Sequence, residues 1–475
     1  MLTLPTERQL RRYCGIDDKE FGVTTLIKQR IQLQVQSLGP EERHGSLQID
    51  EMHVQENLKY DKNNDCLVGL AVNSKNDETL ANKMLAFLFK GLSTNLKIPV
   101  AYFPVNKLNA EQLHELTVTV IKEIEELGLR VQRLVTDNAR VNVSMFKYFK
   151  SINDGDDYVV QHPCDASRKL FLSFDQSHIV KNIRNQVIDR DIIINQQRVS
   201  IEVFRLMLNL NKGNLMNPAR QLKFHHVYPT NLQRQKVAWA LFIFQPQCIA
   251  ALESYRDCNE PGFENIDETI VFLRMIHRWF QMFDVCNTHQ HVYCRLEDKA
   301  PFRHVEDERL KWLAKDFLDY LYKWKEEAKN ERNFLTTETY KALVFTTKSN
   351  VEFIKYALQE LKLKYVLTRK LSTDDIERFF GNVRSQNGQN DLPNVEACSQ
   401  AIRKIVRTQL AYASVHGNVP IVQVKMDKLL IQGAPVQNQK IEAASALVPL
   451  LEEEQEVLDE LNSYPSINFL KIIKS

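Results

Sequence analysis

The chain has 475 residues, of which 44% are apolar and 26% are charged, and its formal net charge is only +2. This length predicts two to four domains, and the low Gly and Pro content excludes fibrous and disordered classes. Because the charge is nearly neutral, any nucleic-acid-binding surface has to be local. With scattered cysteines, no run of eighteen apolar residues and no signal-type start, a soluble intracellular protein with reduced thiols is expected.

Residues 1–45 carry apolar residues at helical spacing in Glu7–Tyr13 and Thr24–Leu38, with basic residues outside the apolar stripe. Two interpretations stay open. The segment is a helical lead-in packed on the next domain, or it is part of a helix-turn-helix that contacts DNA. Cys14 is the only cysteine before Cys66, so a four-ligand zinc domain is not expected in this stretch.

Residues 46–189 have the pattern of an α/β domain. Leu47 and Ile49 alternate with polar neighbours, which is typical of a strand, and this strand carries Asp50 at or near its end. Further strands are predicted at Leu67–Val72, Met84–Leu88, Pro99–Val105, Val131–Asp137 and Phe171–Phe174.

The helix before Val131–Asp137 has clear start and stop signals. Asn109 can cap it, Gln112 follows at the capping-box spacing, and Gly128 ends it. Strand, helix and strand then form a right-handed crossover, which places the last strand parallel to the one before the helix. If the strand of Asp50 is its neighbour, the two aspartates meet, but the sequence leaves that pairing open.

A helical segment supplies a third carboxylate. Four apolar residues within Ile376–Val383 recur at helical spacing, which leaves Glu377 on the bordering face. Asp50, Asp137 and Glu377, if they converge, need a cation, and oxygen ligands suit Mg²⁺ or Mn²⁺. Two such ions support phosphodiester chemistry. The alternative is a set of solvated carboxylates, because the chain contains 60 Asp and Glu.

The stretches around these carboxylates resemble those of the P-element-type transposases. They occur in the same order over residues 4–410 and are Ile49–Met52, Tyr60–Asp65 with Gly69, Thr136–Asn138, Phe174–Asn185, Glu377–Arg384 and Asn387–Pro393. The resemblance implies the α/β ribonuclease-H-like (RNase H-like) fold of DDE transposases and integrases. It also implies that Asp50, Asp137 and Glu377 form the catalytic, metal-binding triad of an enzyme that cleaves and joins DNA strands.

The same resemblance implies double-stranded DNA as substrate, a homo-oligomer on that DNA and a nuclear location, with no membrane partner. The family usually carries a zinc-coordinating DNA-binding domain ahead of this region, which is not expected here. An alternative is therefore a domesticated, catalytically silent factor that keeps the fold and binds DNA or protein.

Two residues near the triad have competing interpretations. Asp175 also follows an apolar run and rivals Asp137, which is favoured because its Thr–Asp–Asn sequence follows the crossover helix. The next helix is expected to begin with Ser177 as N-cap and to run through Val187. His178 is interpreted as a packing histidine in preference to a catalytic group.

Asp137 and Glu377 are 240 residues apart, more than an RNase H-like core needs, so a mostly helical insertion domain is predicted. Its helices are expected at Lys236–Leu252, Thr269–Phe283 and Leu310–Lys329. The resemblance implies GTP binding for this insertion, without assigning residues, because no Gly-rich phosphate loop occurs. The expected segments are a lead-in at 1–45, RNase H-like halves at 46–189 and 350–410, the insertion at 190–349, and a tail at 411–475 with an acidic helix at Leu451–Leu461.

Two features inside the insertion keep alternatives open. From His178 to Lys236 there are ten Lys and Arg against three Asp and Glu, which indicates either a solvated helical face or part of a DNA channel. Four possible zinc ligands follow within a short loop: Cys286, His289, His291 and Cys294. Their spacing is tighter than the usual zinc arrangement, so a polar loop is favoured.

Overall fold

The computed structural model describes residues 21–61, 65–73, 79–152, 157–190, 192–210, 219–328 and 331–408. The helices expected at Glu7–Tyr13 and Leu451–Leu461 lie outside the described residues. Near the start of the described part, helix α2 (Thr25–Ser37) confirms the second N-terminal helix, and the Thr24 side chain caps it.

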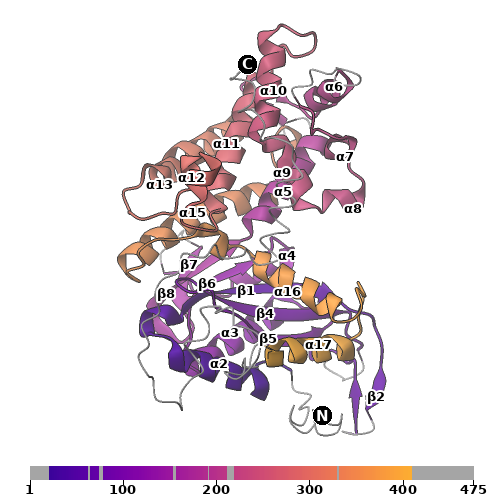
Figure 1. The fold of residues 1–475 in the computed structure, drawn as a ribbon, viewed down its shortest axis with the longest axis vertical. Helices are drawn as coiled ribbons and strands as arrows, with labels where there is room; N and C mark the ends of the chain where they lie inside the picture. The colour runs from indigo at the N-terminus through magenta and orange to yellow at the C-terminus, as the bar shows by residue number, and fades with distance from the viewer. Residues whose placement is uncertain are drawn as a thin grey trace, which may run out of the picture. The chain divides into compact units, whose positions relative to one another are not determined.

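A six-stranded sheet with the order β5-β4-β1-β6-β8-β7 is the centre of the fold (Figure 1). Its strands are β1 (His44–His53), β4 (Lys83–Gly91), β5 (Lys97–Val105), β6 (Arg130–Thr136), β7 (Val159–His162) and β8 (Asp165–Phe174). Strands β1, β6 and β8 pair in parallel, whereas β4, β5 and β7 pair antiparallel with their neighbours. The sheet confirms the predicted α/β class, whereas its strand order was not predicted.

Parallel pairing of β1 with β6 settles the question that the sequence left open. Gln48 pairs with Val135, so Asp50 and Asp137 follow at the same end of the two strands. Strand β6 runs parallel to β5, as the crossover predicted, but β4 and β1 lie between them.

Helix α3 (Ala110–Glu126) connects β5 to β6 and begins as expected. The Asn109 side chain accepts a hydrogen bond from the Gln112 amide at 2.8 Å, and the Gln112 side chain accepts one from the Asn109 amide at 3.2 Å. Both bonds are local, which is why the capping box could be predicted from sequence.

Two expected elements differ in the structure. Leu67–Val72 is not a strand of the central sheet, because β3 (Cys66–Val68) pairs with β2 (Lys59–Asp61) in a separate hairpin. Gly69 ends that strand with a positive φ of +119°. Helix α5 (Gln176–Asp189) has Asp175 as its N-cap, not Ser177. Aspartate caps as well as serine does, and Asp175 comes first after β8.

The insertion is mostly helical, as expected. After the hairpin of β9 (Ile192–Ile194) and β10 (Gln197–Val199), its elements are α6 (Glu202–Leu210), α7 (Phe224–Val227), α8 (Asn231–Arg234), α9 (Val237–Leu241), η2 (Phe242–Phe244), α10 (Pro246–Asp257), α11 (Asp267–Phe283), α12 (Gln290–Cys294), η3 (Glu297–Lys299), α13 (Glu308–Trp312), η4 (Leu313–Phe317), α14 (Leu318–Glu327) and η5 (Glu331–Asn333).

The helix expected at Lys236–Leu252 is interrupted before Pro246, which lacks an amide hydrogen and starts a new helix. By length and composition alone, Val237–Asp257 is apolar enough to cross a membrane, a test that core helices also pass. In this protein, α9 packs against α5, and α10 packs against α11.

Helix α15 (Thr337–Gln359) returns the chain to the sheet and runs without a break across residue 349. The Thr346 hydroxyl accepts from the Phe174 amide at 3.1 Å and donates to the Phe174 carbonyl at 3.3 Å. After η6 (Thr368–Leu371), α16 (Asp374–Ser385) lies against β1 and β4, and α17 (Val395–Thr408) packs on α2 and β5 (Figure 1). A short helix, α4 (Arg140–Phe146), and a turn, η1 (Pro40–Arg43), complete the described elements.

Candidate active site

Three carboxylates from separate elements gather at one end of the sheet. Asp50 lies within β1, three residues before its last residue, Asp137 directly follows β6, and Glu377 lies in the first turn of α16. The charges of Asp137 and Glu377 both raise the pKa of Asp50. The structure therefore brings the three predicted residues into electrostatic contact.

The pKa of Asp50 reflects its burial and the negative charges of the two neighbouring carboxylates. Burial raises the pKa of Asp50 to about 7, and the two neighbouring carboxylates act in the same direction. The Glu51 amide, which donates to Asp50 Oδ1 at 2.7 Å, and the charge of His178 oppose that rise. Repelling oxygen donors of this kind are stabilised by a hard divalent cation.

His178 contacts Glu377, which the sequence interpretation as a packing histidine missed. Its Nε2 lies 3.0 Å from Glu377 Oε1. Burial alone would lower the pKa of His178, but the hydrogen bond to Glu377 and the charge of Asp175 raise it to about 9. The available signal was the place of His178 in the first turn of a helix that follows the strand beside Asp137.

The environments of the two rival aspartates differ. Asp137 is partly exposed, and its Oδ1 accepts from the Asn142 side chain at 2.6 Å and from the Ala139 amide at 3.0 Å. Asp175 is only 1% exposed. Its two oxygens accept from the amides of Thr373 at 3.0 Å and His178 at 2.9 Å. This geometry favours Asp137 as the second carboxylate of the site.

Further charged groups border the carboxylates. Burial raises the pKa of Asp374 to about 7, Asp175 adds to that rise, and Arg369 opposes it. Burial lowers the pKa of Lys181, whereas the charge of Glu377 raises it. The sequence interpretation singled out neither residue, because each acquires its neighbours only through packing of α5 and α16 against the sheet.

Family models match two parts of the chain. The TNP-like RNase H N-terminal domain matches residues 19–150, and the TNP-like GTP-binding insertion domain matches residues 177–296. The Transposable element P transposase of Drosophila melanogaster is 23% identical over 363 residues, which are 76% of this chain and 44% of that protein. The chain is a relative of the P-element-type transposases.

A second relative is the DNA transposase THAP9 of Homo sapiens, 25% identical over 301 residues, which are 60% of this chain and 32% of that protein. The solved Drosophila P element transposase strand transfer complex aligns with a TM-score of 0.70 and 21% identity over 85% of each chain. This likeness confirms the RNase H-like α/β fold with its inserted helical domain. The chain spans less than half the length of the two curated relatives.

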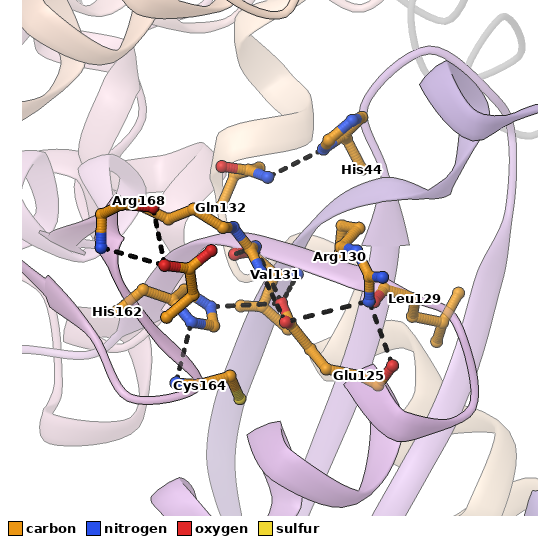
Figure 2. Close-up of polar contacts among 11 residues, drawn as sticks. His44, Glu125, Leu129, Arg130, Val131, Gln132, His162, Cys164 and Arg168 are labelled. Carbon is orange, nitrogen blue, oxygen red and sulfur yellow. Dashed lines mark hydrogen bonds and ion pairs between the residues drawn. The ribbon is translucent and has the colours of Figure 1, made fainter.

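A second cluster of possible metal ligands in this chain lies near the first residues of β6, at the opposite end of that strand from Asp137. Among the described residues, Glu125, His162 and Cys164 are the group whose possible metal-ligand atoms all lie within 4.8 Å of one another (Figure 2). The oxygens of Asp50, Asp137 and Glu377 do not form so tight a group, so their arrangement is more open.

Hydrogen bonds within the Glu125 cluster occupy the Glu125 oxygens and the His162 nitrogens that a metal would need. Arg168 donates twice to Glu125, at 2.6 and 2.9 Å, and the Val131 amide donates at 2.8 Å. His162 Nδ1 accepts from the Cys164 amide at 3.1 Å, which leaves its proton on Nε2, 3.2 Å from Glu125. The cluster is a structural clasp that joins α3, β6, β7 and β8 (Figure 2).

Within the described residues, the four Cys and His side chains between Cys286 and Cys294 do not form a tight ligand group. The basic stretch is not one solvated face, because Arg184 is completely buried, and Arg234 pairs with Asp189.

Proposed function

We propose that this chain is the catalytic region of a DNA transposase of the P-element type, with Asp50, Asp137 and Glu377 as its catalytic and metal-binding residues. The observation that carries this proposal is the convergence of three carboxylates from β1, β6 and α16. Burial raises the pKa of Asp50 to about 7, and the charges of Asp137 and Glu377 add to that rise. All of their donor atoms are oxygens, which fits Mg²⁺ or Mn²⁺. Two such ions would support cleavage and joining of a phosphodiester.

The residues of the chain prepare this site. Asn142 and the Ala139 amide fix one oxygen of Asp137, and His178 fixes one oxygen of Glu377. When bound, divalent ions lower the pKa of an attacking water or 3′-hydroxyl and stabilise the leaving oxygen. Positive charge on His178 and Lys181 attracts the phosphate backbone of double-stranded DNA. A homo-oligomer on DNA and a nuclear location follow from the family and are part of the same proposal.

A Mn²⁺ titration tests the site directly. Wild type is expected to bind Mn²⁺, whereas Asp50→Asn, Asp137→Asn and Glu377→Gln are expected to lose binding and metal-dependent DNA strand cleavage, with an unchanged circular dichroism spectrum. Glu51→Gln is the matched control, because its carboxylate pairs with Lys83 at 2.6 Å. Equal Mn²⁺ binding in wild type and the triad variants would contradict the assignment.

The alternative, a catalytically silent DNA- or protein-binding factor, makes a different prediction in the same experiment. Such a factor binds DNA without requiring metal and cleaves no strand in its presence. Metal-dependent cleavage that Asp137→Asn abolishes would exclude it. DNA binding with no cleavage in Mg²⁺ or Mn²⁺ would support it.

We also propose that the insertion binds GTP through a cationic and aromatic cluster at α7 and the start of α9. Lys236, which precedes α9, is exposed, and its Nζ lies 4.3 Å from the centre of the Trp239 ring. The centre of that ring lies 4.0 Å from the centre of the His225 ring. An exposed ammonium group can bind phosphate, and a partly exposed aromatic ring can contact a base.

Thermal melting tests the nucleotide proposal. GTP is expected to raise the melting temperature of wild type, and ATP to raise it less. Lys236→Ala is expected to remove the effect, whereas Lys315→Ala, which changes an exposed lysine elsewhere in the insertion, is expected to retain it. If GTP leaves the melting temperature of wild type unchanged at millimolar concentration, this proposal is wrong and the transposase proposal is unaffected.

A further inference from the structure

Helix α16, which carries Glu377, begins without a side-chain cap of its own. Thr373 occupies the N-cap position, but its side chain makes no capping hydrogen bond. The first amides of a helix have no acceptor within the helix, so they need acceptors from elsewhere. The Ser372 hydroxyl accepts from the Asp374 amide at 3.3 Å, and two buried side chains, Gln48 of β1 and Asp175 directly after β8, supply further acceptors.

Gln48 of β1 is the first of these acceptors. Its Oε1 accepts from the Ile376 amide at 3.0 Å, at the third helical position, which an N-cap side chain normally serves. The same amide also donates to the Thr373 carbonyl at 3.1 Å, so Gln48 is one of its two acceptors. Gln48 is 0% exposed and lies two residues before Asp50, on the same face of β1. One face of this strand therefore presents Asp50 and also holds the start of the helix that carries Glu377.

Asp175 is the second acceptor. Its Oδ1 accepts from the Thr373 amide at 3.0 Å, and its Oδ2 accepts from the His178 amide at 2.9 Å. Its own amide donates at 2.9 Å to the carbonyl of Thr136, the residue before Asp137. A single buried residue thus joins the end of β6, through its amide, to the first turns of α5 and α16, through its carboxylate.

We propose that Gln48 and Asp175 are positioning residues that set where Glu377 lies relative to Asp50 and Asp137. The donors and acceptors are 328 and 198 residues apart in the chain, so these bonds fix a geometry that no local signal determines. The inference rests on the proposed function for the use of that geometry. The hydrogen bonds can be tested without it.

Gln48→Met preserves the length of the side chain and removes its acceptor. Amide hydrogen exchange at Ile376 is expected to accelerate at least ~10-fold, and Mn²⁺ affinity to fall about 10-fold, the scale of effect seen when a group that orients a metal ligand is lost. Gln112→Met is the matched control, because it removes the corresponding side-chain bond at the start of α3. The control is expected to retain wild-type Mn²⁺ affinity and wild-type exchange at Ile376.

Two results would overturn the inference. Unchanged exchange at Ile376 would mean that the cap contributes nothing, and accelerated exchange with unchanged Mn²⁺ affinity would mean that it does not position the site. If Gln48→Met fails to fold, Asp175→Asn replaces it and is expected to accelerate exchange at Thr373 or His178 and to weaken Mn²⁺ binding. If wild type binds no Mn²⁺, the proposed function fails, and the exchange comparison still decides whether the caps hold α16.

Discussion

The charged form of Asp50 lowers the stability of the folded protein, although the same carboxylate is proposed to bind the metal. Its pKa is raised from 3.8 to about 7, so the folded state disfavours its charged form, and stability contributed by this residue falls as the pH rises toward 7. In EDTA at pH 8, Asp50→Asn is therefore expected to stabilise the protein by about 1–3 kcal/mol, measured by urea unfolding. The asparagine can keep the bond from the Glu51 amide.

The same variant is expected to gain no stability from Mn²⁺, which should raise the unfolding midpoint of wild type. Glu51→Gln provides the comparison, since its unfolding midpoint should respond to Mn²⁺ as wild type does. A less stable Asp50→Asn protein in EDTA would show that burial and the neighbouring carboxylates do not disfavour the charged form of Asp50 in the folded state.

Glu125 presents the opposite electrostatic case. Burial alone would raise its pKa, but hydrogen bonds from His162 and Arg168 lower it from 4.5 to about 2. The clasp therefore contributes its full stability above pH 4.5 and loses it as the pH falls from 4.5 toward 2. Glu125→Gln is expected to cost about 2 kcal/mol at pH 7, after allowance for solvent screening at Arg168.

Urea unfolding across pH 3 to 7 tests whether the stability contributed by Glu125 falls with falling pH. The difference between wild type and Glu125→Gln should shrink as the pH falls. Glu115→Gln, on the exposed side of the same helix, should match wild type at every pH. A constant difference across the range would assign the effect to packing and not to charge.

At the scale of elements, β1 and β4 approach closely where a side chain is absent. A Cβ on Gly45 would overlap the buried ring of Phe89 in the paired strand. Gly45→Ala is therefore expected to lower the free energy of unfolding by about 1–3 kcal/mol in urea titrations. Gly381→Ala is the control, because no atom lies within 4 Å of its Cβ position, and the change should stabilise α16 by about 0.5–1 kcal/mol.

The elements that sequence predicted well are those whose signals are local. The capping box of Asn109 and Gln112 and the apolar stripe around Glu377 lie within a few residues, so α3 and α16 were predicted. The pairing of β1 with β6 and the contact of His178 with Glu377 join distant parts of the chain, so a single sequence does not determine either of them, although the place of His178 in the first turn of its helix was a signal. Ser177 was a wrong cap because two good capping residues competed, and the strand end selected Asp175.

At the scale of the whole described unit, the insertion leaves and re-enters the RNase H-like domain at one place. Asp175 precedes α5, where the chain departs, and it also accepts from Thr373 at the start of α16, where the chain has returned. Because the entropy of closing a loop grows only slowly with its length, an excursion of this size is tolerated. The rejoining contacts thus determine whether Glu377 reaches Asp50 and Asp137.

The contact between β6 and α15, where the chain returns from the insertion, contains a buried charge. Arg133 of β6 is 0% exposed, donates to the Asn350 side chain of α15, and lies 5.2 Å from the Phe353 ring. Burial lowers its pKa to about 9, and its Nε and Nη1 have no hydrogen-bond partner among the described residues. A charge buried in this way costs folding free energy that apolar packing would not.

Asn350→Leu alone is expected to destabilise by about 3–5 kcal/mol, because it leaves Arg133 without its amide partner. The double variant Arg133→Met/Asn350→Leu should recover wild-type stability or exceed it by about 1–4 kcal/mol, since both polar groups are removed together. Urea unfolding of the two single variants and the double variant measures their coupling. Additive losses would show that α15 docks on β6 independently of this pair, and that the other contacts of α15 align the two halves of the domain.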